Sequence, residues 1–247
     1  MTVFSKAEFT TAFDRQIGKD LEELKEQYKF RFGRMTLITV LVFLALFLGV
    51  RAFFPPLLLV FLLAFYLVYW YFSGRHRRVR RDLGEESRRA ILKGVAQLAV
   101  DHSGEAAVLS HRFMPEGDFK RSALFKFEPE SYQGGDLIDL GSPGKVEICH
   151  ITASRPEDPF EEQEEFEFEG YLFKIKPSAG RFPEDNTGLE GLPDGRRFHW
   201  DGDFAWMAYP DKSRLLNDKV ITFGPDYDSL YNLYLMMRQA RLMAAQG

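Results

Sequence analysis

The chain has 247 residues, a single cysteine and a formal net charge of −4. One cysteine cannot form an internal disulfide, which excludes the disulfide-rich secreted class and agrees with a reducing compartment. The charge is unevenly divided, because residues 1–81 hold 13 Lys and Arg against 6 Asp and Glu, whereas residues 82–247 hold 19 against 30. We therefore expect a basic region early in the chain and a separate acidic domain after it.

Residues 1–33 are predicted to form an amphipathic helix. Ser5 and Glu8 have the spacing of a capping box, and Phe4 and Phe9 have the spacing of a hydrophobic staple around it. The apolar positions that follow recur every three or four residues and form one stripe, namely Phe9, Phe13, Ile17, Leu21, Leu24 and Tyr28. We expect the protein's own domain or a second cytoplasmic helix to bury this stripe, with self-association and the membrane surface as alternatives.

Residues 34–74 contain two long apolar runs, which predict a transmembrane helical hairpin. Neither 35–50 nor 52–74 contains a charged residue. Extended to position 54, the first run has 20 residues, and such a helix measures about 30 Å, the thickness of a bilayer core. Pro55 and Pro56 suit the first turn of the second helix. A buried hairpin of a soluble core and a cleaved signal peptide fit these runs less well.

Positive charges flank the predicted hairpin on both sides. Lys25, Lys29, Arg31 and Arg34 precede it, Arg75, Arg77, Arg78, Arg80 and Arg81 follow it, and its corner holds only Arg51. Because an excess of Lys and Arg marks the cytoplasmic side, both termini are expected in the cytoplasm. Residues 75–102 would form a basic collar and a connecting helix. The position of the basic cluster favours this topological role over nucleic-acid binding.

Residues 103–247 are predicted to form a cytoplasmic α+β domain with a mostly antiparallel sheet and flanking helices. Strands are expected at 145–152, 164–176, 198–209 and 219–223, and turns at 133–136 and 141–144. A bulge or tight turn is expected at Gly170–Tyr171, where the apolar alternation changes phase. Asp226 is expected to cap a last helix that closes the core.

The order of short motifs along the chain resembles that of a known family. After the two-helix hairpin come Phe119–Phe125 with Ser122–Ala123–Leu124, then Tyr132–Gly141 with Gly134–Gly135–Asp136, then Phe168–Phe173, then Phe204–Asp211. This order is similar to the bacterial family catalogued as domain of unknown function 3137, from which the chain departs at His150. The resemblance implies an inner-membrane protein with a cytoplasmic α+β domain, and it implies no established activity and no catalytic residues.

No motif for nucleotide binding, acyl transfer or metal-dependent hydrolysis occurs in the sequence, so no cofactor, metal or catalytic residue is predicted. Three polar residues form a candidate site: Asp136 in the Gly–Asp turn, Asp139 shortly after it, and His150 on the following strand. Cys149 precedes His150, but neighbours on a strand point to opposite faces, which argues against a Cys–His nucleophile.

Asp201 and Asp203 are a second carboxylate pair and could also be a fragment of a calcium loop. The later ligands of such a loop are missing, and Asp beside Gly is first a turn former. We therefore favour a turn at this position.

The strongest charge feature is the acidic run over 161–169. Glu165, Glu167 and Glu169 alternate with phenylalanines, so on a strand the three carboxylates share one face. This face could dock a basic partner. The alternative is a solvated strand that resists edge pairing.

These features predict a membrane-anchored interaction or scaffold subunit of the bacterial inner membrane. Its expected partners are the lipid bilayer and a protein partner or a second copy, with no nucleic acid. Ala45 and Gly49 have a spacing that lets a neighbouring helix approach closely, either from the same hairpin or from another chain. The alternative function is a membrane-associated hydrolase or ligand-sensing domain that uses the polar site near Asp136.

Overall fold

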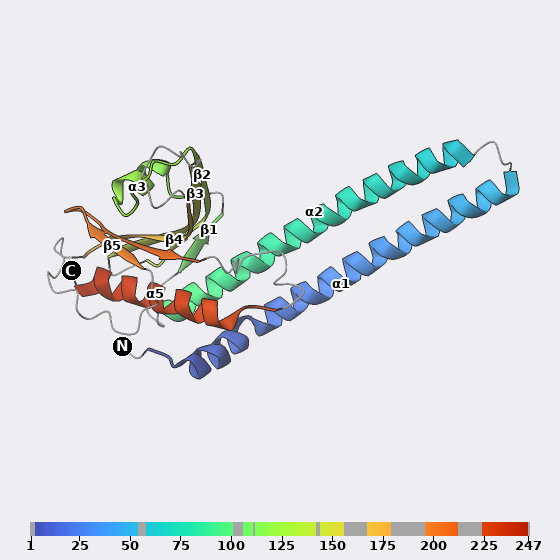
Figure 1. Ribbon diagram of the computed structural model, residues 1–247. Coiled ribbons are helices and arrows are strands. Elements are labelled where there is room, and N and C mark those ends of the chain that lie inside the picture. Colours follow the sequence, from blue (N-terminus) through green and yellow to red (C-terminus); the bar gives the residue numbers. More distant parts are fainter. Residues whose placement is uncertain are drawn as a thin grey trace. The chain divides into compact units, whose positions relative to one another are not determined.

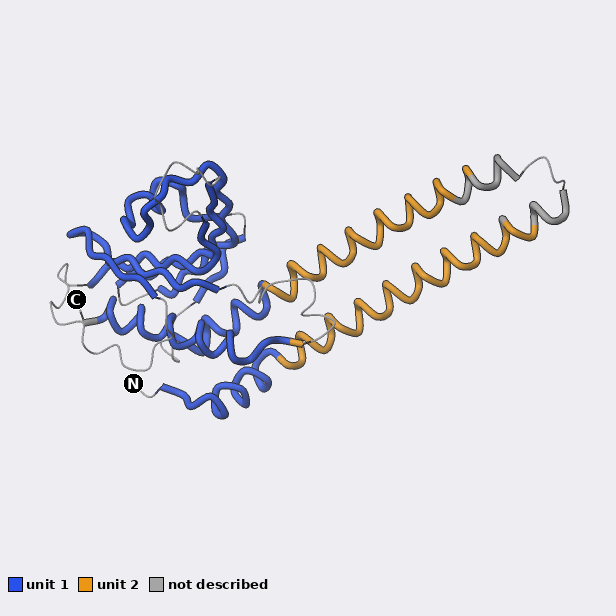
Figure 2. The backbone as a smooth tube through the Cα atoms, viewed as in Figure 1, with its two compact units in different colours: residues 1–17, 89–215, 225–247 blue, residues 18–88, 216–224 orange. Residues whose placement is uncertain are grey.

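The structure is a computed structural model of the chain. It describes residues 3–53, 58–100, 106–110, 112–141, 144–155, 167–178, 196–211 and 224–246. The described chain divides into two compact units, which Figure 2 colours separately. Unit 1 comprises residues 1–17, 89–215 and 225–247, and unit 2 comprises residues 18–88 and 216–224.

Unit 1 is built on a six-stranded sheet with the order β1-β2-β3-β4-β6-β5. The strands are β1 (Ala107–Leu109), β2 (Ser131–Asp139), β3 (Lys145–Ser154), β4 (Glu167–Lys176), β5 (Arg197–Trp200) and β6 (Ala205–Pro210). Every neighbouring pair is antiparallel. β1 and β5 are the outer strands of the described sheet (Figure 1). The predicted α+β class with an antiparallel sheet is therefore confirmed.

Helices cover both faces of this sheet. In Figure 1, α3 (Glu116–Arg121) and α5 (Tyr227–Gln246) lie on opposite sides of it. Phe119 of α3 packs in one buried cluster with Cys149 of β3 and Leu172 of β4. Tyr171, next to Leu172, is also fully buried and points to the other face, because neighbours on a strand alternate. The central strands are thus buried on both sides.

This double burial explains a wrong prediction in β4. The β3–β4 pairing runs without a shift through Gly170 and Tyr171, so no bulge lies there. The change of phase in the sequence arises because consecutive residues are buried on opposite faces. The actual irregularity lies in β2, between Gly134 and Leu137, where a turn was predicted. The strand predicted at 219–223 lies outside the described residues.

The capping box at the start of α1 (Lys6–Phe53) is confirmed. The Ser5 amide donates to Glu8 Oε2 at 2.8 Å, and the Glu8 amide donates to Ser5 Oγ at 3.4 Å. The hydrogen bond from the Ser5 backbone, followed by that from its hydroxyl, lowers the pKa of the Glu8 carboxyl. Phe4 stacks on Tyr234 of α5 with ring centroids 6.0 Å apart.

The apolar stripe of α1 begins against α5, within unit 1. Phe9 and Phe13 are fully buried. The Phe9 ring lies 5.0 Å from that of Tyr234, and the Phe13 ring meets Tyr227 edge-on at 6.0 Å. The prediction that the protein's own domain buries this part of the stripe is therefore confirmed.

Unit 2 contains the remainder of α1 and the first part of α2 (Leu58–Ala99). The two helices meet where the Phe32 ring lies 4.8 Å from the imidazole of His76. α1 continues through Gly33 without a break. The expected boundary after residue 33 is therefore not a break in the backbone.

The predicted transmembrane hairpin is contradicted. Among the residues that the structure describes, no helix combines the length and the apolar character needed to cross a membrane. The two apolar runs belong to helices of 48 and 42 residues, which carry many charged residues beyond those runs. Pro55 and Pro56, together with the side chains at 46, 49–62, 64 and 65, lie outside the described part, and so does the Ala45–Gly49 spacing.

Candidate functional site

Two of the candidate polar residues, Asp136 and His150, lie opposite each other at the irregularity in β2. The pairing with β3 shifts between Gly134 and Leu137, so that Gly135 and Asp136 both stand opposite His150. This arrangement is a β-bulge, which inserts one residue and redirects the side chains beside it. The sequence had suggested a turn here because two glycines precede the aspartate. The bulge lets the chain remain in the strand.

Asp136 is paired with an arginine that no sequence motif had indicated. Arg89 of α2 donates from Nε to Asp136 Oδ2 at 3.2 Å. The Asp136 side chain is 14% exposed and that of Arg89 is 35% exposed. Among the described residues, Asp136 is the hydrogen-bond partner of Arg89.

Asp139 has a local structural role. Its Oδ1 accepts a hydrogen bond from the Gly141 amide at 2.9 Å, where Gly141 has a φ of 63°. A side chain that binds the backbone two residues later is typical of an Asx-turn. Asp139 thus shapes the connection between β2 and β3. In the register of the two strands it lies opposite Glu147, three positions before His150.

Cys149 and His150 point to opposite faces of β3. The Cys149 thiol is buried in the cluster beneath α3 and donates to the Gly135 carbonyl at 3.3 Å. The His150 ring meets the Tyr171 ring edge-on, with centroids 5.1 Å apart. The sulfur and the imidazole therefore do not face each other, and the geometry provides no Cys–His nucleophile.

The second aspartate pair is held by Arg121 of α3, whose Nε and Nη2 donate to Asp201 and Asp203 at 2.7 Å each. Partial burial acts to raise the pKa of Asp201. Hydrogen bonds from Trp206, the amides of Phe204 and Asp203, and Arg121 outweigh it and lower the pKa to about 2. Since these oxygens are occupied by protein donors, the pair joins α3 to the β5–β6 turn. No group of three metal-ligating side chains occurs among the described residues.

The proposed docking face is described in part. Glu165 lies outside the described residues, Glu167 is exposed and Glu169 is half-buried. Phe168 between them packs in the cluster beneath α3, so the two carboxylates project from the opposite face of β4. Because β4 lies between β3 and β6, its acidic residues do not protect a sheet edge.

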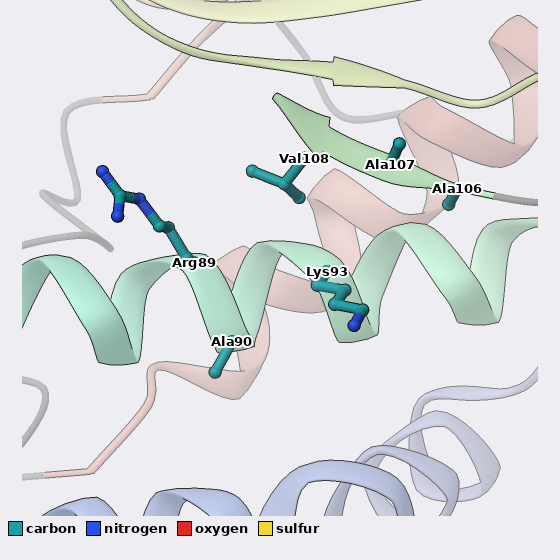
Figure 3. Close-up of a pocket in the computed structure, with 6 residues that line it drawn as sticks. All are labelled: Arg89, Ala90, Lys93, Ala106, Ala107 and Val108. Carbon is teal, nitrogen blue, oxygen red and sulfur yellow. The ribbon is translucent and has the colours of Figure 1, made fainter. Parts of the chain in front are cut away.

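A pocket of about 400 Å³ adjoins Arg89 in unit 1 (Figure 3). Its lining consists of Arg89, Ala90 and Lys93 from α2, with Ala106, Ala107 and Val108 from β1 and the residue before it. Neither Asp136 nor His150 is part of this lining, and Arg89 connects the pocket to Asp136. The pocket residues were missed because β1 was not predicted. The available signal was the spacing of Arg89 and Lys93, four positions apart on an expected helix.

Comparison of the chain with family models, curated proteins and solved structures found no match. The resemblance to domain of unknown function 3137 therefore stays a prediction.

Proposed function

We propose that this protein is a membrane-associated interaction or scaffold subunit. The observation that carries the proposal is the apolar surface of unit 2. It consists of Leu37, Ile38, Val40, Leu41, Leu44, Phe47 and Leu48 of α1 with Leu63, Tyr66, Leu67, Tyr69, Trp70 and Tyr71 of α2, each at least 40% exposed. Exposed apolar surface of this extent marks a site that binds a membrane or another protein.

Neighbouring residues favour a lipid bilayer as the partner of this surface. Tyr69, Trp70 and Tyr71 follow the apolar residues of α2, and Tyr and Trp suit the boundary between acyl chains and headgroups. Five arginines come next, between Arg75 and Arg81. Anionic headgroups attract each such cation by about 1 kcal/mol. We propose the cytoplasmic side of the bacterial inner membrane as the location, with both termini in the cytoplasm.

Unit 1 supports an interaction role more than a catalytic one. Among its described residues, one polar cluster serves to hold the fold: Arg121 joins Asp201 and Asp203, and Lys174 Nζ donates to Asp118 Oδ2 at 2.8 Å. These charged groups are satisfied by one another rather than directed at a shared reacting position. We expect a protein partner or a second copy to bind this unit, and no nucleic acid.

The test is flotation of the full-length chain with membranes from bacterial cells at native abundance. The wild-type protein is expected to float with the membranes, and a variant with Leu41→Glu and Leu67→Glu is expected to remain in the soluble fraction. Val3→Glu with Phe113→Glu is the matched control, because it places the same charges on exposed apolar residues of unit 1. A wild-type protein that stays soluble would overturn the proposal.

A further inference from the structure

A band of positive charge adjoins the exposed apolar surface of unit 2, the unit coloured orange in Figure 2. Residues 27–81 contain no Asp or Glu. The ring contact between Phe32 and His76 joins α1 to α2 in the middle of this band, since arginines adjoin both rings in the sequence. The two helices therefore carry their cations at the same level of unit 2. The exposed members of this cationic band are Lys29, Arg31 and Arg34 of α1 with Arg75, Arg77, Arg78, Arg80 and Arg81 of α2.

The cations of α2 reach the surroundings in several directions. Its five band arginines are all exposed and fall within about two turns of helix, whereas His76 and Val79 between them are half-buried. Trp70 precedes Arg77 by about two turns, so the two side chains leave the same side of α2. Trp70 is 67% exposed. An aromatic residue suited to the headgroup boundary is thus aligned with a cation of the band.

We propose that unit 2 selects anionic phospholipids, whose headgroup phosphates the cationic band binds. This inference rests on the membrane association proposed above and names the class of lipid. The apolar surface fits the acyl chains of any phospholipid, but zwitterionic headgroups would leave the charge of the band unbalanced. Every member of the band except Lys29 is an arginine, and a guanidinium can donate two parallel hydrogen bonds to a phosphate.

The test is quenching of Trp70 fluorescence by brominated lipids, with the full-length protein transferred from detergent into bilayers. Both bilayers contain equal amounts of phosphatidylglycerol and phosphatidylcholine, and the bromine is on one lipid or on the other. We expect stronger quenching by brominated phosphatidylglycerol, with a relative association constant roughly fivefold in its favour, the effect of one cation beside the exchanged lipid. Trp70→Phe identifies the Trp70 signal, because Trp200 and Trp206 belong to unit 1.

Two pairs of substitutions show whether the band causes this preference. Arg77→Gln with Arg78→Gln should bring the relative association constant close to one, because Arg77 lies on the Trp70 side of α2. Arg15→Gln with Arg112→Gln is the matched control, since it removes two exposed cations of unit 1, and it should keep the wild-type preference. All four arginines are exposed, so both double variants should fold.

The outcomes separate this inference from the membrane association. Equal quenching by the two lipids, or a preference that the Arg77 and Arg78 substitutions leave unchanged, would overturn the inference while the membrane association stands. Loss of the preference on addition of an RNA oligonucleotide would assign the band to nucleic acid and overturn the inference as well. No quenching of Trp70 by either lipid would overturn the membrane association and, with it, the lipid selectivity.

Discussion

Tyr227 of α5 donates a hydrogen bond to Asp14 of α1 across 2.6 Å, although 213 positions separate the two residues. Two further contacts reinforce this one. The Tyr231 hydroxyl donates to the carbonyl of Phe4, just before α1, at 2.9 Å, and Lys6 of α1 forms an ion pair with Asp228. The first turns of α1 are therefore a structural part of unit 1.

Phe9→Ala should strongly destabilise the protein. The ring is fully buried against α5, and truncating a buried Phe costs about 3–5 kcal/mol of unfolding free energy. The exposed residue Arg15 provides the control, since Arg15→Ala should change that free energy by no more than about 0.5 kcal/mol. Urea denaturation of the full chain in mild detergent measures both. Equal midpoints for the two variants would show that α1 does not stabilise unit 1.

The contact between Tyr227 and Asp14 should make stability fall at high pH. Burial, followed by the hydrogen bond and the charge of Asp14, raises the pKa of Tyr227 to about 12. The folded state therefore keeps this proton between about pH 10, where a free Tyr ionises, and the raised value. The contribution is complete below pH 10 and is lost as the pH rises through that interval.

Tyr227→Phe removes the phenol and should reduce the pH dependence of the unfolding free energy between about pH 10 and 12. The measurement is urea denaturation at several pH values, with ultraviolet absorbance to follow phenol ionisation. Tyr66→Phe is the matched control, because Tyr66 is 62% exposed. Identical pH profiles for wild type and Tyr227→Phe would contradict the prediction.

Local signals in the sequence predicted local structure well. The capping box at Ser5 formed as expected, and Asp226 caps the last helix through Oδ1, which accepts from the Asp228 amide at 3.1 Å. The strand predicted at 145–152 is the greater part of β3. Each of these features is determined by side chains that lie within a few positions of one another in the sequence.

Features that depend on tertiary contacts were missed. Gly134 and Gly135 suggested a turn, but pairing with β3 keeps them in a strand with a bulge. Arg89 belongs to the candidate site only because it binds Asp136, which lies 47 positions away in sequence. Gly170 could signal either a bulge or a close backbone approach, and only the position of β6 distinguishes these.

Asp201→Asn should flatten the acid limb of the stability profile. The pKa of Asp201 is lowered to about 2, so its ionised form contributes stability above the ordinary carboxyl pKa of about 4. That contribution is lost as the pH falls through the interval between these values. Asp203→Asn is the control, because the Asp203 side chain is 72% exposed and should contribute less. Unfolding free energies at pH 2 to 5 test this, and an equal effect of both variants would contradict it.

Gly170→Ala should disrupt the pairing of β4 with β6. A Cβ at this position would overlap the Tyr209 carbonyl oxygen and lie 2.8 Å from Pro210 Cα. Both are backbone atoms of the paired strand, so relief requires β6 to shift, and overpacking of this kind costs about 1–3 kcal/mol. Gly117→Ala in α3 is the matched control, because no other atom lies within 4 Å of its added Cβ. There, Ala should be neutral or stabilise the helix by up to about 1 kcal/mol. Thermal unfolding of the two variants beside the wild type measures the difference, and a stable Gly170→Ala protein would mean that β4 and β6 do not approach this closely.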